Sequence, residues 1–171
     1  LYGLYSNNSI NILSDYAVTE KADGQRYLLY IDSSKHGYFI DTKLQVLDTG
    51  IKFPNIKGEW ILDGEYIRQD KDGSPIQLFM IFDVYIAERE LFEYPQKLPY
   101  YDPTKLSREK ILNVFKKEYI PMINVVEYDF QPIGLFLKNY EYSIPNDEII
   151  DDYSKQILQK SKQIINKSKE G

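Results

Sequence analysis

The feature that most constrains the fold is the sequence pattern of residues 16–84, in which short runs rich in β-branched and aromatic residues alternate with turn-forming residues. Strand-like runs are predicted at residues 16–19, 26–31, 38–40, 44–47, 60–67 and 76–84. The last two runs flank Asp70-Lys71-Asp72-Gly73, a sequence typical of a turn, and so predict a β-hairpin. The pattern indicates a mainly antiparallel sheet.

The second half of the chain changes character. Asp102-Pro103 predicts a helix start, with Asp as the N-cap and Pro in the first turn, and apolar residues then mark a helix to about Tyr119. Residues 124–137 return to a strand-like pattern, and from Asn146 apolar residues recur at helical spacing opposite a polar face. The fold class expected is therefore α+β, a mainly antiparallel sheet with flanking helices.

Composition narrows the functional classes. No apolar run approaches the roughly 20 residues needed to span a bilayer, so we expect no membrane partner. The absence of cysteine excludes disulfides and thiolate metal sites and fits a reducing compartment. The net charge of −5 argues against a free-standing nucleic-acid binder, because such a protein normally carries a basic face. Any contact with RNA or DNA must come from a local patch or from another part of a larger protein.

The sharpest motif is KxDGxR, present as Lys21-Ala22-Asp23-Gly24-Gln25-Arg26 between two strand-like runs. One interpretation is a type I′ hairpin turn at Asp23-Gly24, with Lys21 and Arg26 as solvated flanks. The other is nucleotidyl transfer, in which a lysine at a strand-to-turn junction presents its amine to an α-phosphate. The turn's amides and the arginine would then hold the nucleotide. Such a lysine must lose its proton to attack, so it needs desolvation or cationic neighbours.

A second motif places two carboxylates around a glycine inside an apolar run, as Leu62-Asp63-Gly64-Glu65. In a continuous strand Asp63 and Glu65 lie two residues apart and share one face. Two carboxylates on one face suit a divalent metal or a ribose hydroxyl. The alternative is a tight hairpin at Asp63-Gly64 with Glu65 facing solvent.

A third motif is the nearly all-apolar run Phe79-Met80-Ile81-Phe82-Asp83-Val84. The structural interpretation is a buried central strand whose terminal Asp83 caps a following turn. The functional interpretation places an aromatic face of this strand against a purine, with Asp83 near the site.

In order and approximate spacing, the three motifs resemble signature segments of the covalent nucleotidyltransferase superfamily. This superfamily comprises messenger-RNA capping guanylyltransferases and ATP- or NAD-dependent ligases. The match covers about residues 16–84 and looks most like the guanylyltransferase domain of capping enzymes from large cytoplasmic DNA viruses. The resemblance implies the nucleotidyltransferase fold and a location in the cytoplasm, in a viral factory or in the virion.

The resemblance also implies a reaction. Lys21 would attack the α-phosphate of GTP, expel pyrophosphate and form a phosphoramide with GMP, which then passes to a 5′-diphosphate RNA end. Arg26 would hold the ribose or a phosphate. Glu65 would contact the ribose or a metal, supported by Asp63, and Mg²⁺ or Mn²⁺ would stabilise charge on the phosphates.

The remaining candidates implied by the resemblance surround the nucleotide. Phe82 would stack on the purine, Thr19 and Glu20 would border the base, and Asp23 with Gly24 would complete the nucleotide-binding turn.

The chain also departs from the superfamily pattern. The fourth and fifth motifs are not found after Val84: residues 133–135 lack the expected acid, and the lysines of residues 160–162 lie in a helical pattern. The oligonucleotide-binding barrel that normally follows is missing as well. We therefore expect residues 1–171 to be a partial nucleotidyltransferase domain, poorly active alone, whose partners include the remaining domains of a larger capping enzyme.

Two alternatives stay open at this level. A ligase adenylylation domain commonly has Glu two residues before the nucleophile, where this chain has Thr19, so guanine is favoured over adenine. The other alternative is a non-catalytic module that serves nucleotide binding or assembly. The missing rear motifs favour this module, whereas the intact Lys21 and Arg26 favour an active enzyme.

Overall fold

A computed structural model of the 171-residue chain divides into two compact units, Ala22–Lys138 and a smaller unit made of Leu1–Lys21 with Asn139–Gly171. In the smaller unit β1 (Ala17–Val18) pairs antiparallel with β9 (Glu141–Tyr142). The structure describes residues 17–19, 21–70, 72–88, 95–125 and 133–142.

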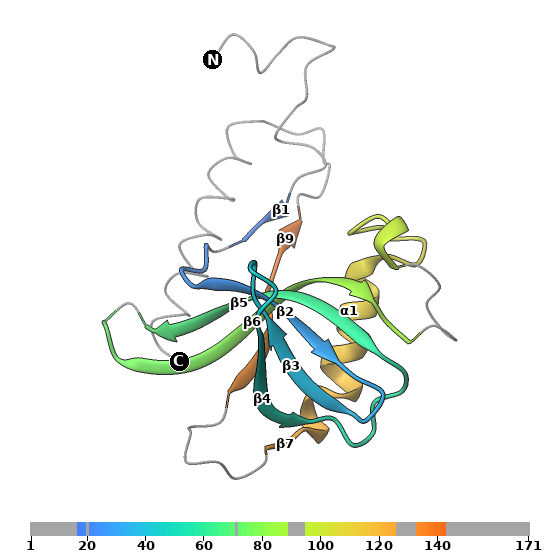
Figure 1. The fold of residues 1–171 in the computed structure, drawn as a ribbon. Coiled ribbons are helices and arrows are strands. Elements are labelled where there is room, and N and C mark those ends of the chain that lie inside the picture. The colour runs from blue at the N-terminus through green and yellow to red at the C-terminus, as the bar shows by residue number, and fades with distance from the viewer. Residues whose placement is uncertain (1–16, 20, 71, 89–94, 126–132, 143–171) are drawn as a thin grey trace, which may run out of the picture. The chain divides into compact units, whose positions relative to one another are not determined.

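The larger unit is built on a seven-stranded sheet with the order β7-β4-β3-β2-β5-β6-β8 (Figure 1). Every neighbouring pair is antiparallel except β6 and β8, which run parallel. The predicted mainly antiparallel sheet and the hairpin formed by β5 and β6 are thus confirmed. The strands are β2 (Gln25–Ile31), β3 (His36–Ile40), β4 (Val46–Lys52), β5 (Trp60–Gln69), β6 (Pro75–Ile86), β7 (Asn124–Val125) and β8 (Gly134–Leu137).

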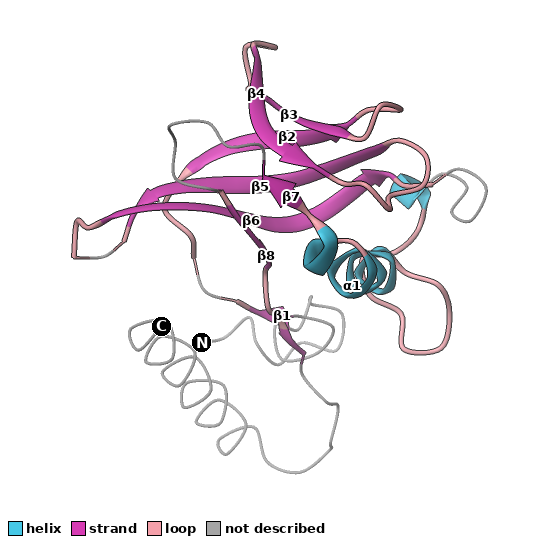
Figure 2. Ribbon diagram, turned by 90° about the horizontal axis from the view of Figure 1, so that it is seen from below, coloured by secondary structure: helices cyan, strands magenta, loops and turns pink. Residues whose placement is uncertain are grey.

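One α-helix, α1 (Arg108–Glu118), packs on one face of this sheet (Figure 2). Its buried side chains are Ile111, Leu112 and Phe115, and the Phe115 ring lies 5.2 Å from the Trp60 ring. Two short 3-10 helices, η2 (Pro95–Lys97) and η3 (Ile120–Met122), complete the helices of the described residues. None of the described helices combines the length and apolar character needed to cross a bilayer.

The predicted helix start at Asp102 is wrong. The Asp102 carboxylate instead accepts the amides of Thr104 and Lys105 at 2.8 and 2.9 Å and closes a separate turn. The helix begins five residues later, where Ser107 is the N-cap and its hydroxyl accepts from the Lys110 amide. Both residues are good caps, and the choice between them follows from the helix face that meets the core.

Two strand predictions also shift. β4 begins at Val46 rather than at residue 44, because Leu44 adopts a left-handed φ of 63° in the preceding turn. The strand-like pattern of residues 124–137 resolves into β7 and β8 with residues 126–132 outside the described part. The helix predicted from Asn146 lies outside the described residues as well.

The pairing of β2 with β5 decides which side chains face α1. Residues directly opposite each other in an antiparallel pair share a face. The core pairs are Tyr27 with Gly64, Leu29 with Leu62 and Ile31 with Trp60, all of them buried. The intervening pairs, Arg26 with Glu65 and Leu28 with Asp63, therefore lie on the opposite face of these two strands.

Candidate functional site

The two carboxylates of the second motif lie in an unbroken strand. β5 runs through Asp63, Gly64 and Glu65, so the alternative of a hairpin tip at Asp63-Gly64 is wrong and the predicted shared face is confirmed. Gly64 is required by packing: a Cβ there would lie 2.4 Å from Cζ of Phe79 and 2.8 Å from the Met80 carbonyl oxygen. The absence of a side chain at Gly64 thus allows Phe79 and the backbone of β6 to pack directly against β5 between the two acids.

Gly24 has a comparable role at the start of β2. Its N–H donates to Oε1 of Glu65 at 2.8 Å, and a Cβ there would lie 2.5 Å from the Tyr66 carbonyl oxygen. Asp23-Gly24 is not a hairpin turn, because β2 pairs with β3 and β5 whereas β1 pairs with β9. The glycine instead lets the KxDGxR segment approach β5 closely enough to bond Glu65.

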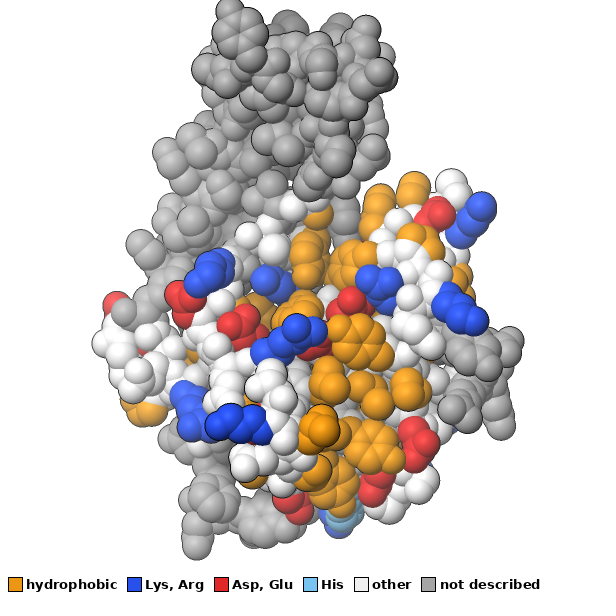
Figure 3. Space-filling model, turned by 45° about the horizontal axis from the view of Figure 1, so that its top comes forward, with side chains coloured by type: hydrophobic (Ala, Val, Ile, Leu, Met, Phe, Trp, Pro, Cys, Tyr) orange, Lys and Arg blue, Asp and Glu red, His pale blue; other side chains and the backbone are white. Residues whose placement is uncertain are grey.

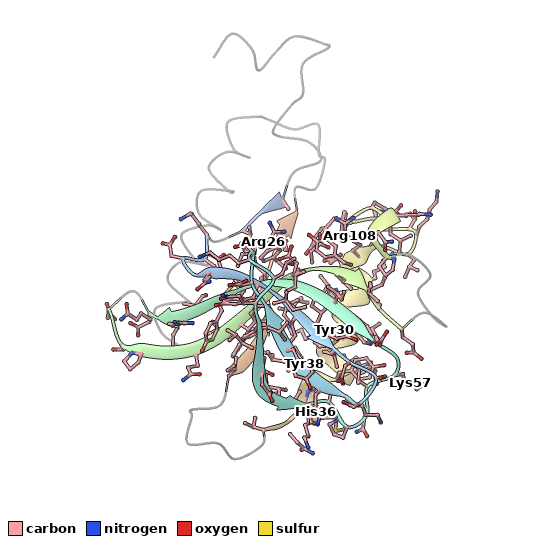
Figure 4. The ribbon with its side chains drawn as sticks, viewed as in Figure 1. Arg26, Tyr30, His36, Tyr38, Lys57 and Arg108 are labelled. Atoms are coloured by element: carbon pink, nitrogen blue, oxygen red, sulfur yellow. The ribbon has the colours of Figure 1, made fainter. Side chains whose placement is uncertain are left out.

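Arg26 and Asp63 form the central ion pair of the site. Nε of Arg26 donates to Oδ1 of Asp63 at 2.9 Å and Nη2 donates to Oδ2 at 2.5 Å, a bidentate geometry that strengthens the pair. The Asp63 side chain is 1% exposed, whereas that of Arg26 is 59% exposed. The anion is thus buried, whereas the cation, labelled in Figure 4, reaches the surface.

Tyr85 completes this group. Its hydroxyl donates to Oδ2 of Asp63 at 2.7 Å and accepts from Nη2 of Arg26 at 3.2 Å. Burial, together with the hydrogen bond to Asp63, raises the pKa of Tyr85, so the phenol is neutral at neutral pH. The hydrogen bond to Asp63 and its negative charge raise the pKa of Arg26 further above its ordinary value, so the guanidinium stays charged.

Tyr85 was not identified from the sequence, because its position in the site depends on a β-bulge. Ile61 pairs with Ile86 and Leu62 with Val84, so Tyr85 is left without a partner in β5. Phe82 is skipped in the same way, between the pairs formed by Asp83 and Ile81. A bulge bends the strand and redirects side chains, and no local signal in residues 79–85 marks where it falls.

Phe82, the predicted purine-stacking residue, is half-buried on β6. Nζ of Lys138 lies 6.0 Å from its ring centroid, a distance at which a cation is attracted to an aromatic face. A stacked base would therefore use the opposite face of the Phe82 ring.

Asp83 forms a second ion pair, with Arg108 at the start of α1. Its Oδ1 accepts from Nε of Arg108 at 2.7 Å, and Nη1 of the arginine donates to the Leu98 carbonyl at 2.6 Å. Because β6 continues to Ile86, Asp83 does not cap a turn as the structural interpretation expected. Arg108 was not predicted either, because the sequence around an arginine on a helix does not indicate which residue of a distant strand it will pair with.

The remaining predicted residues are distributed between the units. Thr19 and Lys21 belong to the smaller unit, where the Thr19 hydroxyl donates to the Asn139 carbonyl at 2.7 Å. Lys21 is exposed, as is Asp23 in the larger unit, and Glu20 lies outside the described residues. The residues that the structure brings together are Gly24, Arg26, Asp63, Glu65 and Tyr85.

The carboxylates differ in what they can offer a metal. Both oxygens of Asp63 are engaged by Arg26 and Tyr85, whereas Oε2 of Glu65 has no hydrogen-bond partner among the described residues. The described part of the chain contains no cluster of three or more His, Cys, Asp or Glu side chains arranged for a metal. Of the two carboxylates, Glu65 is therefore the one with an oxygen to contribute.

The surface around these groups mixes charge and apolar character. In Figure 3, hydrophobic side chains gather in a band on the face of the larger unit turned toward the viewer, and basic and acidic side chains lie mostly along its sides. Among the described residues, Nη1 of Arg26 has no hydrogen-bond partner, so its two N–H groups can bind an oxygen of a phosphate or a ribose.

Comparison with known proteins gives two matches. The family model of the mRNA capping enzyme catalytic domain matches residues 6–161. A probable mRNA-capping enzyme of Acanthamoeba polyphaga mimivirus is 35% identical over 94 residues, which is 52% of this chain and 7% of that protein. The chain thus spans a small part of the length of this relative.

Proposed function

This chain belongs to the family of mRNA capping enzyme catalytic domains, and on that basis we propose that it transfers GMP from GTP to the 5′-diphosphate end of RNA. The observation that carries the proposal is that hydrogen bonds join two motifs that are distant in sequence. The KxDGxR segment bonds the Asp-Gly-Glu segment through Gly24 to Glu65 and Arg26 to Asp63. The result is a surface arginine opposite Glu65, and among the described residues neither Nη1 of Arg26 nor Oε2 of Glu65 has a hydrogen-bond partner.

In the proposed reaction, the deprotonated amine of Lys21 attacks the α-phosphorus of GTP. A nitrogen–phosphorus bond forms while the bond to the leaving pyrophosphate breaks. A terminal phosphate oxygen of the RNA 5′-diphosphate then attacks the same phosphorus, which breaks the phosphoramide and returns Lys21. Both steps move a phosphoryl group between nucleophiles, so positioning and charge stabilisation dominate their rates.

The other residues would bind and orient the nucleotide. Arg26 would hold a phosphate or ribose oxygen through Nη1, and Glu65 would accept a ribose hydroxyl or bind a metal through Oε2. Phe82 would stack on guanine, with Thr19 and Glu20 beside the base. A Mg²⁺ or Mn²⁺ ion, when bound, would offset negative charge on the phosphates.

The partners proposed are GTP, the RNA end and further domains of a longer capping enzyme. The length of the mimivirus relative and the net charge of −5 both support further domains, since RNA binding needs a basic surface. A cytoplasmic site of action, such as a viral factory, fits the viral source of that relative.

The first test is covalent labelling. Incubation with α-labelled GTP and Mg²⁺ or Mn²⁺ is expected to leave label on the denatured protein, and ATP is expected to label it less. Lys21→Ala and Lys21→Arg should both abolish the label, because an arginine cannot lose its proton to become a nucleophile. Label that survives denaturation in either variant would exclude Lys21 as the nucleophile. Preferential labelling by ATP would point to ligase-type chemistry instead.

A further inference from the structure

The site contains two acids that need separate partners. Asp63 on β5 and Asp83 on β6 are directly opposite each other in the ladder. Like charges in such a pair destabilise a sheet unless each is neutralised. Arg26 neutralises Asp63 and Arg108 neutralises Asp83, so each acid has its own arginine.

The contacts of Arg26 leave one edge of its guanidinium open. A guanidinium has five N–H groups, one on Nε and two on each Nη. Nε and one N–H of Nη2 bond Asp63, and the other N–H of Nη2 bonds Tyr85. Three of the five N–H groups are thus fixed within the site. The two on Nη1 have no partner among the described residues.

The Tyr85 hydroxyl closes this network from the other side. It uses its single hydrogen to donate to Asp63 and a lone pair to accept from Arg26, so the three side chains form a ring of hydrogen bonds. Asp63 is almost fully buried, so water cannot readily replace the donor that Tyr85 supplies. The side chain of Arg26 is mostly exposed, so its orientation depends on its hydrogen bonds to Asp63 and Tyr85.

We propose that Tyr85 is a positioning residue for the nucleotide, which acts through Arg26 by fixing the plane of its guanidinium so that Nη1 faces the ligand. The role rests on the proposed function, because it assumes that Arg26 binds a nucleotide oxygen. The bulge that leaves Tyr85 unpaired in β5 is what allows its hydroxyl to reach Asp63. Preorganising an arginine in this way lowers the entropy lost when the ligand binds.

The test compares Tyr85→Phe with Tyr30→Phe. Tyr30 is a matched control, because its hydroxyl also donates to a carboxylate, Oε1 of Glu59, at 2.8 Å and does not touch Arg26. In single-turnover labelling with GTP, Tyr85→Phe should raise the GTP concentration for half-maximal rate about tenfold and change the maximal rate less than about twofold. Tyr30→Phe should change neither. Equal values for the two variants would overturn the proposal.

A double-variant cycle shows whether the effect passes through Arg26. In an Arg26→Ala background, Tyr85→Phe should have no further effect on the GTP concentration dependence, since the group to be positioned is gone. A tenfold effect that persists in that background would mean that Tyr85 acts independently of Arg26, which contradicts the proposal. Melting temperatures of all variants show that each one is folded.

A second measurement does not depend on activity. In protein with ¹⁵N-labelled arginine, the Nε–H of Arg26 should exchange with water several-fold faster in Tyr85→Phe than in the wild type or Tyr30→Phe, because its carboxylate partner is less firmly held. If the wild type is not labelled by GTP, the proposed function fails while this comparison still tests the positioning. Unchanged exchange in Tyr85→Phe would overturn the positioning role even in an active enzyme.

Discussion

The two arginine–aspartate pairs of the larger unit are similar in chemistry and opposite in placement. In the first pair the side chain of Asp63 is 1% exposed and that of Arg26 is 59% exposed. In the second pair the values are 18% for Asp83 and 21% for Arg108. The first pair places its anion inside the protein and its cation outside, whereas the second is half-buried on both sides.

This difference indicates different roles. Arg108 uses a second N–H on the Leu98 carbonyl and lies 5.7 Å from the Tyr100 ring, so it ties the segment before α1 to the sheet. Among the described residues, Arg26 hydrogen-bonds Asp63 and Tyr85 through Nε and Nη2, and Nη1 is left without a hydrogen-bond partner. The two arginines thus differ in exposure: the side chain of Arg108 is largely buried, whereas that of Arg26 can be reached by a ligand at the surface.

The largest expected difference concerns stability. Arg26→Ala leaves a buried carboxylate whose remaining donor is Tyr85, and should lower the free energy of unfolding by about 3 kcal/mol. Arg108→Ala leaves a carboxylate that water can reach and that still accepts the Val84 amide, and should cost about 1 kcal/mol. Urea unfolding followed by the fluorescence of Trp60, the single tryptophan, measures both. Equal losses of unfolding free energy would show that the different burial of the two aspartates does not affect what each ion pair contributes to stability.

The next difference concerns activity. Arg26→Lys keeps the charge but loses the planar guanidinium, which can bind Asp63 with one edge and the ligand with another. The initial rate of covalent labelling at low GTP concentration should therefore fall about tenfold. Arg108→Lys should change labelling by less than about twofold, because Arg108 is assigned to structure. Initial rates of covalent labelling test both variants. A larger loss for Arg108→Lys would reverse the assignment of the two roles.

The smallest expected effect is a pH dependence. Burial raises the pKa of Tyr85 above its value in the unfolded chain, so the unfolded state loses the phenolic proton first as pH rises. The stability that depends on the neutral phenol is thus complete below about pH 10 and is lost as pH rises through the pKa of the folded state. Unfolding free energies at several pH values from neutral to strongly alkaline should fall less in Tyr85→Phe than in the wild type. An identical fall would exclude a contribution from Tyr85.

The sequence predicted the parts of the site that depend on local pattern. Alternation and turn residues located β2, β5 and β6, and the two-residue spacing of Asp63 and Glu65 predicted their shared face correctly. The glycines of both motifs also marked real constraints, since each allows an approach that a Cβ would block.

What the sequence could not show depends on contacts between distant segments. The ion pair of Asp83 with Arg108 joins residues 25 positions apart and requires the path of the intervening chain. The bulge at Tyr85 depends on how β5 and β6 pair, and not on the composition of either strand. The helix start illustrates the same limit, because Asp102 and Ser107 are both suitable caps and tertiary packing selects the second.

The bulges of β6 have a consequence for how this segment can change in evolution. In a regular strand, removing one residue turns every side chain on one side of the deletion to the opposite face. Here the skipped positions at Phe82 and Tyr85 set which neighbours face the core and which face the site. Residues 82–85 should therefore accept substitutions more readily than a change of length. Related chains that keep the site are expected to conserve the number of residues there.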